Sequence, residues 1–148
     1  MAALMVSISG IRGIVGESLT PEIITKYALA FGSYVEAGKP VIVGGDSRTS
    51  GTYIMNLVKG CLEACGCHVI DIGIVPTPTV QMEILHHKAA GGVAVTASHN
   101  PPEYNGIKFI PEYGGPADSA ITGEIENHLN NIIKDNNPII IVFIYFNN

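Results

Sequence analysis

The chain is poor in positive charge. Of its 148 residues, 8 are Lys or Arg and 13 are Asp or Glu, which gives a formal net charge of −5. Surfaces that bind nucleic acids or membranes need clustered basic side chains, so neither kind of partner is expected. The sequence also lacks an apolar run near the roughly 18 residues that span a bilayer. Its first eight residues lack a basic start, so we expect no signal peptide and a cytoplasmic location.

Cysteine is scarce and clustered, at Cys61, Cys65 and Cys67. A structural zinc site usually has four ligands in recognisable pairs, and the spacing here fits no standard pattern even if His68 is included. A metal site is therefore the weaker alternative. The favoured interpretation is three free thiols, partly buried as small apolar side chains.

Disorder is excluded by the composition, which is 47% hydrophobic and 14% charged. Apolar runs alternate with segments of helical periodicity, a pattern typical of a single α/β domain. Strands are predicted at residues 4–8, 41–43, 68–72, 93–96 and 108–110, and helices at about 20–36, 51–64, 76–88 and 120–134. The short return through a turn at Asn105-Gly106 favours an antiparallel strand pair, so we expect a mixed sheet.

Three loops are predicted at the carboxyl ends of strands, at residues 10–16, 44–51 and 96–106. Ligands of open α/β sheets gather at this edge. The loops would bring four polar side chains together, and one more lies at the start of the returning strand: Arg12, Arg48, Ser98 and His99, followed by Lys108. An alcohol among three cations and an imidazole suits a phosphate ester, because the cations can neutralise its charge.

Other chemistries lack their motifs. No Gly-x-Ser-x-Gly elbow is present, so acyl transfer is not expected. The Gly-x4-Gly-Lys-Ser/Thr phosphate loop and the Gly-x-Gly-x-x-Gly fingerprint are also absent, because Gly10, Gly13 and Gly16 are spaced by three. Nucleotide binding therefore has little support.

Each candidate also has an ordinary structural explanation. An isolated serine such as Ser98 most often caps a turn, and an isolated His99 is most often an ordinary surface residue. For Lys108 the alternative is a solvated lysine at a strand edge. The polar residues that surround Ser98 between positions 96 and 108 favour the phosphate interpretation for this loop.

The remaining basic residues have structural alternatives too. Arg12 could pair with a nearby acid such as Glu17 or Asp46, and Arg48 could pair with Asp46. The adjacent pair His86-His87 ends a predicted helix, where a cation interacts favourably with the helix dipole, so we interpret it as structural.

Three stretches resemble, in order, the motifs of the alpha-D-phosphohexomutases, the family of phosphoglucomutase, phosphomannomutase and phosphoglucosamine mutase. They are Ser9-Gly10-Ile11-Arg12-Gly13, the segment from Gly44 to Gly51, and the segment from Thr96 to Phe109. The third is similar to the family's phosphoserine loop and is highly specific. The resemblance covers residues from about 6 to 135.

The resemblance implies an α/β fold for residues 1–135, a three-layer α/β/α domain with a mixed, mostly parallel sheet, like domain I of the family. In that family an enzyme phosphoserine exchanges its phosphoryl group with hexose phosphates through a sugar 1,6-bisphosphate. Ser98 would be the phosphoserine, and its phosphate would be a ligand of Mg²⁺. A glucose 1,6-bisphosphate-type activator is implied as well.

The resemblance also implies roles for the neighbours of Ser98. His99 and Lys108 would serve proton transfer and contact the moving phosphoryl group. The residues expected to bind phosphate or substrate are Arg12, Arg48 and Asn100. The family's Asp-Gly-Asp-x-Asp-Arg metal loop and its later sugar- and phosphate-binding loops are absent, so we expect little turnover from this chain alone. The sequence does not indicate which hexose phosphate would be the substrate.

The end of the sequence is unusual. Residues 139–146 are eight consecutive apolar or aromatic residues within a tail at 136–148. The tail is expected to be a covered strand or a divergent end. A rival hypothesis follows from it: the chain is a non-catalytic remnant or an interaction module that self-associates through residues 138–146.

Overall fold

The computed structural model describes residues 3–7 and 9–135. The apolar tail predicted at residues 138–146 lies outside this part of the chain, as does the association hypothesis built on it. None of the helices in the described part has the length and apolarity needed to cross a membrane.

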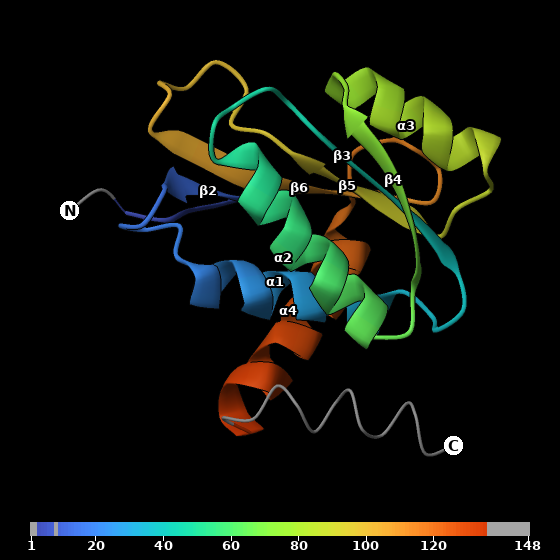
Figure 1. Cartoon of the computed structure of the whole chain (residues 1–148). Coiled ribbons are helices and arrows are strands. Elements are labelled where there is room, and N and C mark those ends of the chain that lie inside the picture. The colour runs from blue at the N-terminus through green and yellow to red at the C-terminus, as the bar shows by residue number, and fades with distance from the viewer. Residues whose placement is uncertain (1–2, 8, 136–148) are drawn as a thin grey trace.

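The described residues form strands and helices in an α/β order (Figure 1). The strands are β1 (Met5–Ser7), β2 (Gly10–Ile14), β3 (Pro40–Gly45), β4 (His68–Ile74), β5 (Gly91–Val95) and β6 (Tyr104–Pro111). The helices are α1 (Pro21–Tyr34), α2 (Gly51–Ala64), α3 (Thr77–His86) and α4 (Ser119–Asp135). The four helices predicted from periodicity are all present, with ends that shift by a few residues.

The strands make one sheet in the order β1-β2-β6-β5-β3-β4. Strand β3 pairs in parallel with β4 and β5, while β6 runs antiparallel to both β5 and β2, and β1 runs antiparallel to β2. Strands β2, β3, β4 and β5 therefore point the same way. The predicted mixed sheet is confirmed.

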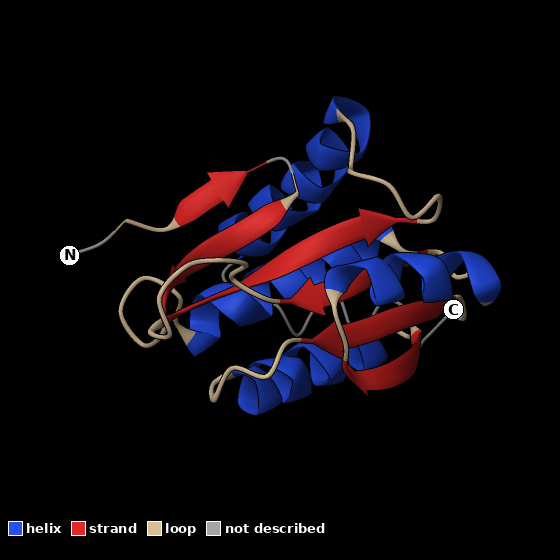
Figure 2. Ribbon diagram, turned by 90° about the horizontal axis from the view of Figure 1, so that it is seen from above, coloured by secondary structure: helices blue, strands red, loops and turns tan. Residues whose placement is uncertain are grey.

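Helices cover the sheet unequally (Figures 1 and 2). Helices α1, α2 and α4 pack on one face, where their apolar side chains and those of the sheet form the larger core. The rings of Phe31 and Phe109 stack there with centroids 4.8 Å apart. On the other face, α3 packs Val80 and Ile84 onto Ile42 of β3. The chain therefore has the expected three-layer α/β/α architecture.

The helix α3 covers only part of its face. It contacts β3 and β5, so within the described residues the half of this face formed by β1, β2 and β6 has no helix over it (Figure 2). Side chains that point to this side from β2 and β6 are therefore accessible. The candidate site lies on this half of the sheet.

Two predicted loops are strand instead. Residues 10–14 form β2 rather than a loop after a strand. Gly10 has φ 139°, and a Cβ there would collide with the carbonyl oxygen of Ile107, so glycine allows β2 to pair closely with β6. The turn predicted at Asn105-Gly106 lies inside β6, where a Cβ on Gly106 would come within 2.8 Å of the Thr96 carbonyl oxygen. Both glycines allow neighbouring backbones to approach closely. In the sequence, a glycine with this role looks the same as a glycine in a turn.

The three cysteines are free thiols, as expected. Cys65 and Cys67 are buried and Cys61 is partly buried. Burial raises the pKa of Cys65 to about 12 and that of Cys67 to about 11, because the thiolate would lose its hydration.

Candidate functional site

The site begins where two parallel strands end side by side. Asp46 follows β3 and Thr96 follows β5, and Val95 of β5 accepts the backbone N–H of Asp46 at 3.0 Å. Thr96 donates its hydroxyl to Asp46 Oδ2 at 2.7 Å. Since adjacent parallel strands place their carboxyl ends at one edge, two residues 50 apart in sequence become direct partners.

Arg48 holds the loop that follows β5. Its Nε donates to Asp46 Oδ2 at 3.3 Å. Its four remaining N–H groups donate to carbonyl oxygens of the loop, two from Nη1 and two from Nη2, at distances of 2.7–3.0 Å: Pro101, Tyr104, Ser98 and Asn100. A guanidinium has five N–H donors, so this arrangement uses all of them. The Arg48 side chain is 13% exposed, and its charge is compensated by Asp46 and four carbonyl dipoles.

The Arg48–Asp46 ion pair, which the sequence left open as the alternative role of Arg48, is present. The expected phosphate-binding role of Arg48 stays a prediction. It would require a phosphate to displace loop carbonyls that already occupy the guanidinium.

Both backbone polar groups of Ser98 are held. Its N–H donates to Thr96 Oγ1 at 3.0 Å, and its carbonyl accepts from Arg48 at 3.0 Å. Ser98 has φ 56°, in the left-handed region that non-glycine residues rarely adopt. Such a conformation costs about 1–2 kcal/mol and persists only where surrounding contacts impose it. Strain of this kind at an exposed serine marks a candidate functional position.

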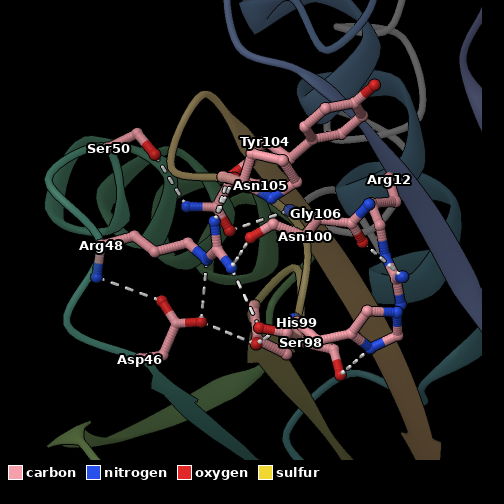
Figure 3. Close-up of polar contacts among 12 residues, drawn as sticks. Arg12, Asp46, Arg48, Ser50, Ser98, His99, Asn100, Tyr104, Asn105 and Gly106 are labelled. Carbon is pink, nitrogen blue, oxygen red and sulfur yellow. Dashed lines mark hydrogen bonds and ion pairs between the residues drawn. The ribbon is translucent and has the colours of Figure 1, made fainter.

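The neighbours of Ser98 make two further contacts (Figure 3). His99 places Nδ1 3.4 Å from Ser98 Oγ. Arg12, on β2, donates from Nη1 to Asn100 Oδ1 at 2.7 Å. Arg12 was predicted in a loop but reaches the serine loop from a strand, because β2 lies beside β6 in the sheet.

Asn105 is a further residue of the site, at a position where the sequence predicted only a turn. It is fully buried and donates from Nδ2 to Ser50 Oγ at 2.8 Å, while its Oδ1 accepts the Gly106 N–H at 2.8 Å. These bonds tie the start of β6 to the residue before α2. In the sequence, Asn105 is only a polar residue before an apolar strand, and that pattern is too common to identify a site residue.

A cleft of about 480 Å³ lies on the uncovered half of the sheet. Its lining includes two cations and five hydroxyl groups and no acid: Arg12, Lys108, Ser7, Ser9, Thr77, Thr96 and Ser98. The volume is in the range of small-molecule sites. A cleft lined by cations in a chain of net charge −5 favours an anionic ligand.

Lys108 lies on the strand next to the one that leads into the serine loop. It is on β6, opposite Ala94 of β5 and Gly10 of β2. In residues 3–7 and 9–135 no acidic side chain forms an ion pair with it, in contrast to Arg48, which pairs with Asp46. Its ammonium group is thus free to neutralise a ligand that enters the cleft.

The described side chains around Ser98 do not by themselves make a Mg²⁺ site. Mg²⁺ prefers near-octahedral oxygen ligands that include one or two carboxylates. The nearby carboxylate of Asp46 already accepts hydrogen bonds from Arg48 and Thr96. Across the part of the chain that the structure describes, three acidic or imidazole ligands gather elsewhere, around Glu83 on α3. The described residues therefore offer Mg²⁺ at most an oxygen of a phosphorylated Ser98.

The structure brings most of the predicted site residues together. Arg12, Ser98 and Lys108 line one cleft. His99 and Asn100 contact Ser98 and Arg12 respectively. Arg48 lies behind the loop and contacts its backbone.

The part of the chain that contains these residues matches a known protein family and several known proteins. The family model "Phosphoglucomutase/phosphomannomutase, alpha/beta/alpha domain I" matches residues 4–136. A protein of Pyrococcus horikoshii named "Probable phosphoglucosamine mutase" is 46% identical over 129 residues, which cover 87% of this chain and 28% of that protein. The chain therefore spans less than a third of that relative's length.

Solved structures share the fold. A crystal structure of a protein from Thermus thermophilus matches with a TM-score of 0.79 and 34% identity, over 86% of this chain and 30% of that one. A phosphoglucomutase/phosphomannomutase family protein from Burkholderia thailandensis matches with a TM-score of 0.72 and 28% identity, over 87% of this chain and 31% of that one. Each match falls on a part of a longer protein.

Proposed function

Because the chain belongs to the phosphoglucomutase/phosphomannomutase family through its α/β/α domain I, we propose that Ser98 carries the phosphoryl group that a phosphohexomutase transfers. The partners of this serine are hexose phosphates, which exchange a phosphoryl group with it through a sugar 1,6-bisphosphate. The observation that supports the proposal most directly is the strained Ser98, at φ 56°, in the lining of a cleft that also contains Arg12 and Lys108.

The step that loads the serine follows from its neighbours. The Ser98 oxygen attacks a phosphorus atom of the bisphosphate, an Oγ–P bond forms, and the P–O bond to the sugar breaks. The leaving sugar oxygen takes up a proton, and the Ser98 hydroxyl loses one. His99 is our candidate acceptor, since its Nδ1 lies 3.4 Å from Ser98 Oγ, and catalytic hydrogen bonds are often long before a substrate binds.

The cations stabilise the charge of this step. Phosphoryl transfer depends mainly on position and on neutralisation of the oxygens around phosphorus. Lys108 and Arg12 supply positive charge in the cleft, and Arg12 is in turn oriented by Asn100. Arg48 positions the loop, since its donors bind backbone carbonyls of Ser98 and of the residues after it rather than facing the cleft.

The chain by itself is expected to turn over little. It spans 28% of its Pyrococcus horikoshii relative, and its described residues offer no carboxylate set for Mg²⁺ beside Ser98. Phosphorylation of Ser98 is a half-reaction that needs fewer groups than a complete cycle. It is therefore the activity to test first.

The test is the intact mass of the purified chain after incubation with glucose 1,6-bisphosphate and Mg²⁺. The wild-type chain is expected to gain one phosphoryl group, and Ser98→Ala to gain none. The variant Ser47→Ala is the matched control, because Ser47 is an exposed serine next to Asp46 and is not in the cleft lining. A wild-type chain that gains no mass, or a Ser98→Ala variant that gains as much, would contradict the proposal for this chain.

A further inference from the structure

A second group of ligand-type side chains lies at the far end of α3. Glu83, His86 and His87 each place one ligand atom within 4.8 Å of the others. Glu83 Oε2 and His87 Nε2 are 3.2 Å apart, and the rings of His86 and His87 are nearly perpendicular with centroids 5.0 Å apart. The first residue of α3, Thr77, lines the serine cleft, so a helix of about 15 Å separates the two places.

We propose that Glu83, His86 and His87 form a binding site for a divalent transition-metal ion such as Zn²⁺. Two imidazoles and one carboxylate are a common three-residue ligand set for zinc, with a further position open to water. Imidazole nitrogens also suit Ni²⁺ and Cu²⁺, whereas Mg²⁺ and Ca²⁺ prefer oxygen ligands. The site would thus be chemically distinct from any Mg²⁺ at a phosphorylated Ser98.

The backbone at the end of α3 places two of these side chains close together. Glu83 and His87 are four residues apart, so their side chains emerge on the same side of the helix. His87 is the C-cap of α3, and its backbone N–H donates to the Glu83 carbonyl oxygen at 2.9 Å. The existing contact between the Glu83 carboxylate and the His87 ring brings two of the ligands together before an ion arrives.

The site is open to solvent. The side chains of Glu83 and His87 are 34% and 38% exposed, so an ion can enter without any movement of the fold. Exposure and the neighbouring Lys88, an exposed cation at φ 49°, will keep the affinity below that of a buried structural site. A bound ion would join the last turn of α3 to its cap and stabilise this helix, which packs on β3 and β5.

The test is calorimetric titration of the purified chain with Zn²⁺ in a buffer without chelator or phosphate. One Zn²⁺ is expected to bind per chain. Loss of a residue that only orients a ligand already weakens metal sites by about 10- to 100-fold, so Glu83→Gln, His86→Ala and His87→Ala should each weaken binding by at least about tenfold. The matched control is His68→Ala, which removes an exposed imidazole that is not part of the group.

A second measurement does not depend on variants. In the wild-type chain, the ring resonances of His86 and His87 should shift on addition of Zn²⁺, while those of His68 and His99 stay in place. Zn²⁺ binding that is absent, that persists unchanged in the three variants, or that is removed by Cys61→Ala instead would overturn the proposal. None of these results bears on phosphorylation of Ser98, which is read from mass.

Discussion

Arg48 donates from Nη2 to the carbonyl oxygen of Ser98 at 3.0 Å, across 50 residues of sequence. The same guanidinium binds Asp46, which accepts the Thr96 hydroxyl, and Thr96 accepts the Ser98 N–H. A closed circuit of hydrogen bonds thus fixes both peptide groups that flank the serine. Both of the bonds to Ser98 use its main-chain groups, so they restrain its backbone at φ 56° without using its side chain.

The variant Arg48→Lys should lose this circuit although it keeps the charge. A lysine offers one ammonium group in place of a planar five-donor fork, so several loop carbonyls lose their partner. We expect the free energy of unfolding to fall by about 2 kcal/mol, because unpaired polar groups cost about 1–3 kcal/mol each when solvent reaches them poorly. Phosphorylation of Ser98 by glucose 1,6-bisphosphate should slow by at least about tenfold, since the reacting oxygen loses its position. Urea unfolding and time-resolved intact mass measure the two effects.

A control separates position from charge. Lys59 makes an ion pair with Asp71 at 2.6 Å, away from the loop. Lys59→Met should therefore lower stability slightly and leave the phosphorylation rate unchanged. An Arg48→Lys variant that is phosphorylated at the wild-type rate would show that the loop holds its shape without the guanidinium.

Replacement of Ser98 itself should reveal the backbone strain. Ser98→Ala and Ser98→Gly both remove the hydroxyl, but only glycine adopts φ 56° without steric cost. We expect the glycine variant to be more stable to urea than the alanine variant by about 1 kcal/mol, the cost of a left-handed residue less the extra chain entropy of glycine. Equal stability of the two would mean that the loop relaxes once the hydroxyl is gone.

Thr96 offers a test of the circuit with little change in volume. Thr96→Val removes the oxygen that binds both Asp46 and the Ser98 N–H, whereas Thr96→Ser keeps it. We expect Thr96→Val to lower the unfolding free energy by about 2 kcal/mol and to slow phosphorylation, since two polar partners each lose a bond. Thr96→Ser should stay close to wild type in phosphorylation. A Thr96→Val variant that is phosphorylated at the wild-type rate would show that the Thr96 hydroxyl is not needed to position the serine.

The helices and the mixed sheet could be predicted from the sequence, because they depend on local features such as apolar periodicity and helix caps. The helix predicted from about residue 20 begins there, because Thr20 caps α1 by accepting the Ile23 N–H on its hydroxyl oxygen at 3.3 Å. The loop predicted where β2 lies and the turn predicted within β6 were wrong, because glycine in a closely paired strand resembles glycine in a loop. Pairing partners are set by the whole sheet, and periodicity in a short segment does not report them.

Most residues of the site could be predicted from the sequence, but the contacts between them could not. The serine loop, Arg12 and Lys108 were recognised as one group because their motif is specific. That Arg48 binds four carbonyls of the loop is a relationship between distant backbone atoms, which leaves no trace in residue type. The buried role of Asn105 was missed for the same reason, since its partners Ser50 and Gly106 are defined by the fold.

The buried thiols give a pH-dependent prediction. Burial raises the pKa of Cys65 from 9.0 to about 12 and that of Cys67 from 9.0 to about 11. The unfolded chain therefore loses thiol protons above about pH 9 while the folded chain keeps them, and stability falls as pH rises from about 9 toward 11. Each thiol contributes at most about 1.4 kcal/mol per pH unit to this fall. Urea unfolding at a series of pH values from about 8 to 11 measures the slope.

The double variant Cys65→Ala, Cys67→Ala isolates the contribution of the thiols. It should be less stable than wild type below the thiol pKa, because both side chains pack in the larger core, but its stability should decline less steeply at alkaline pH. Tyrosines such as Tyr27 and Tyr34, whose pKa values burial also raises, ionise in the same range in both proteins, so the difference in slope belongs to the cysteines. Parallel slopes for the two proteins would show that the thiols ionise as readily in the folded chain as in the unfolded one.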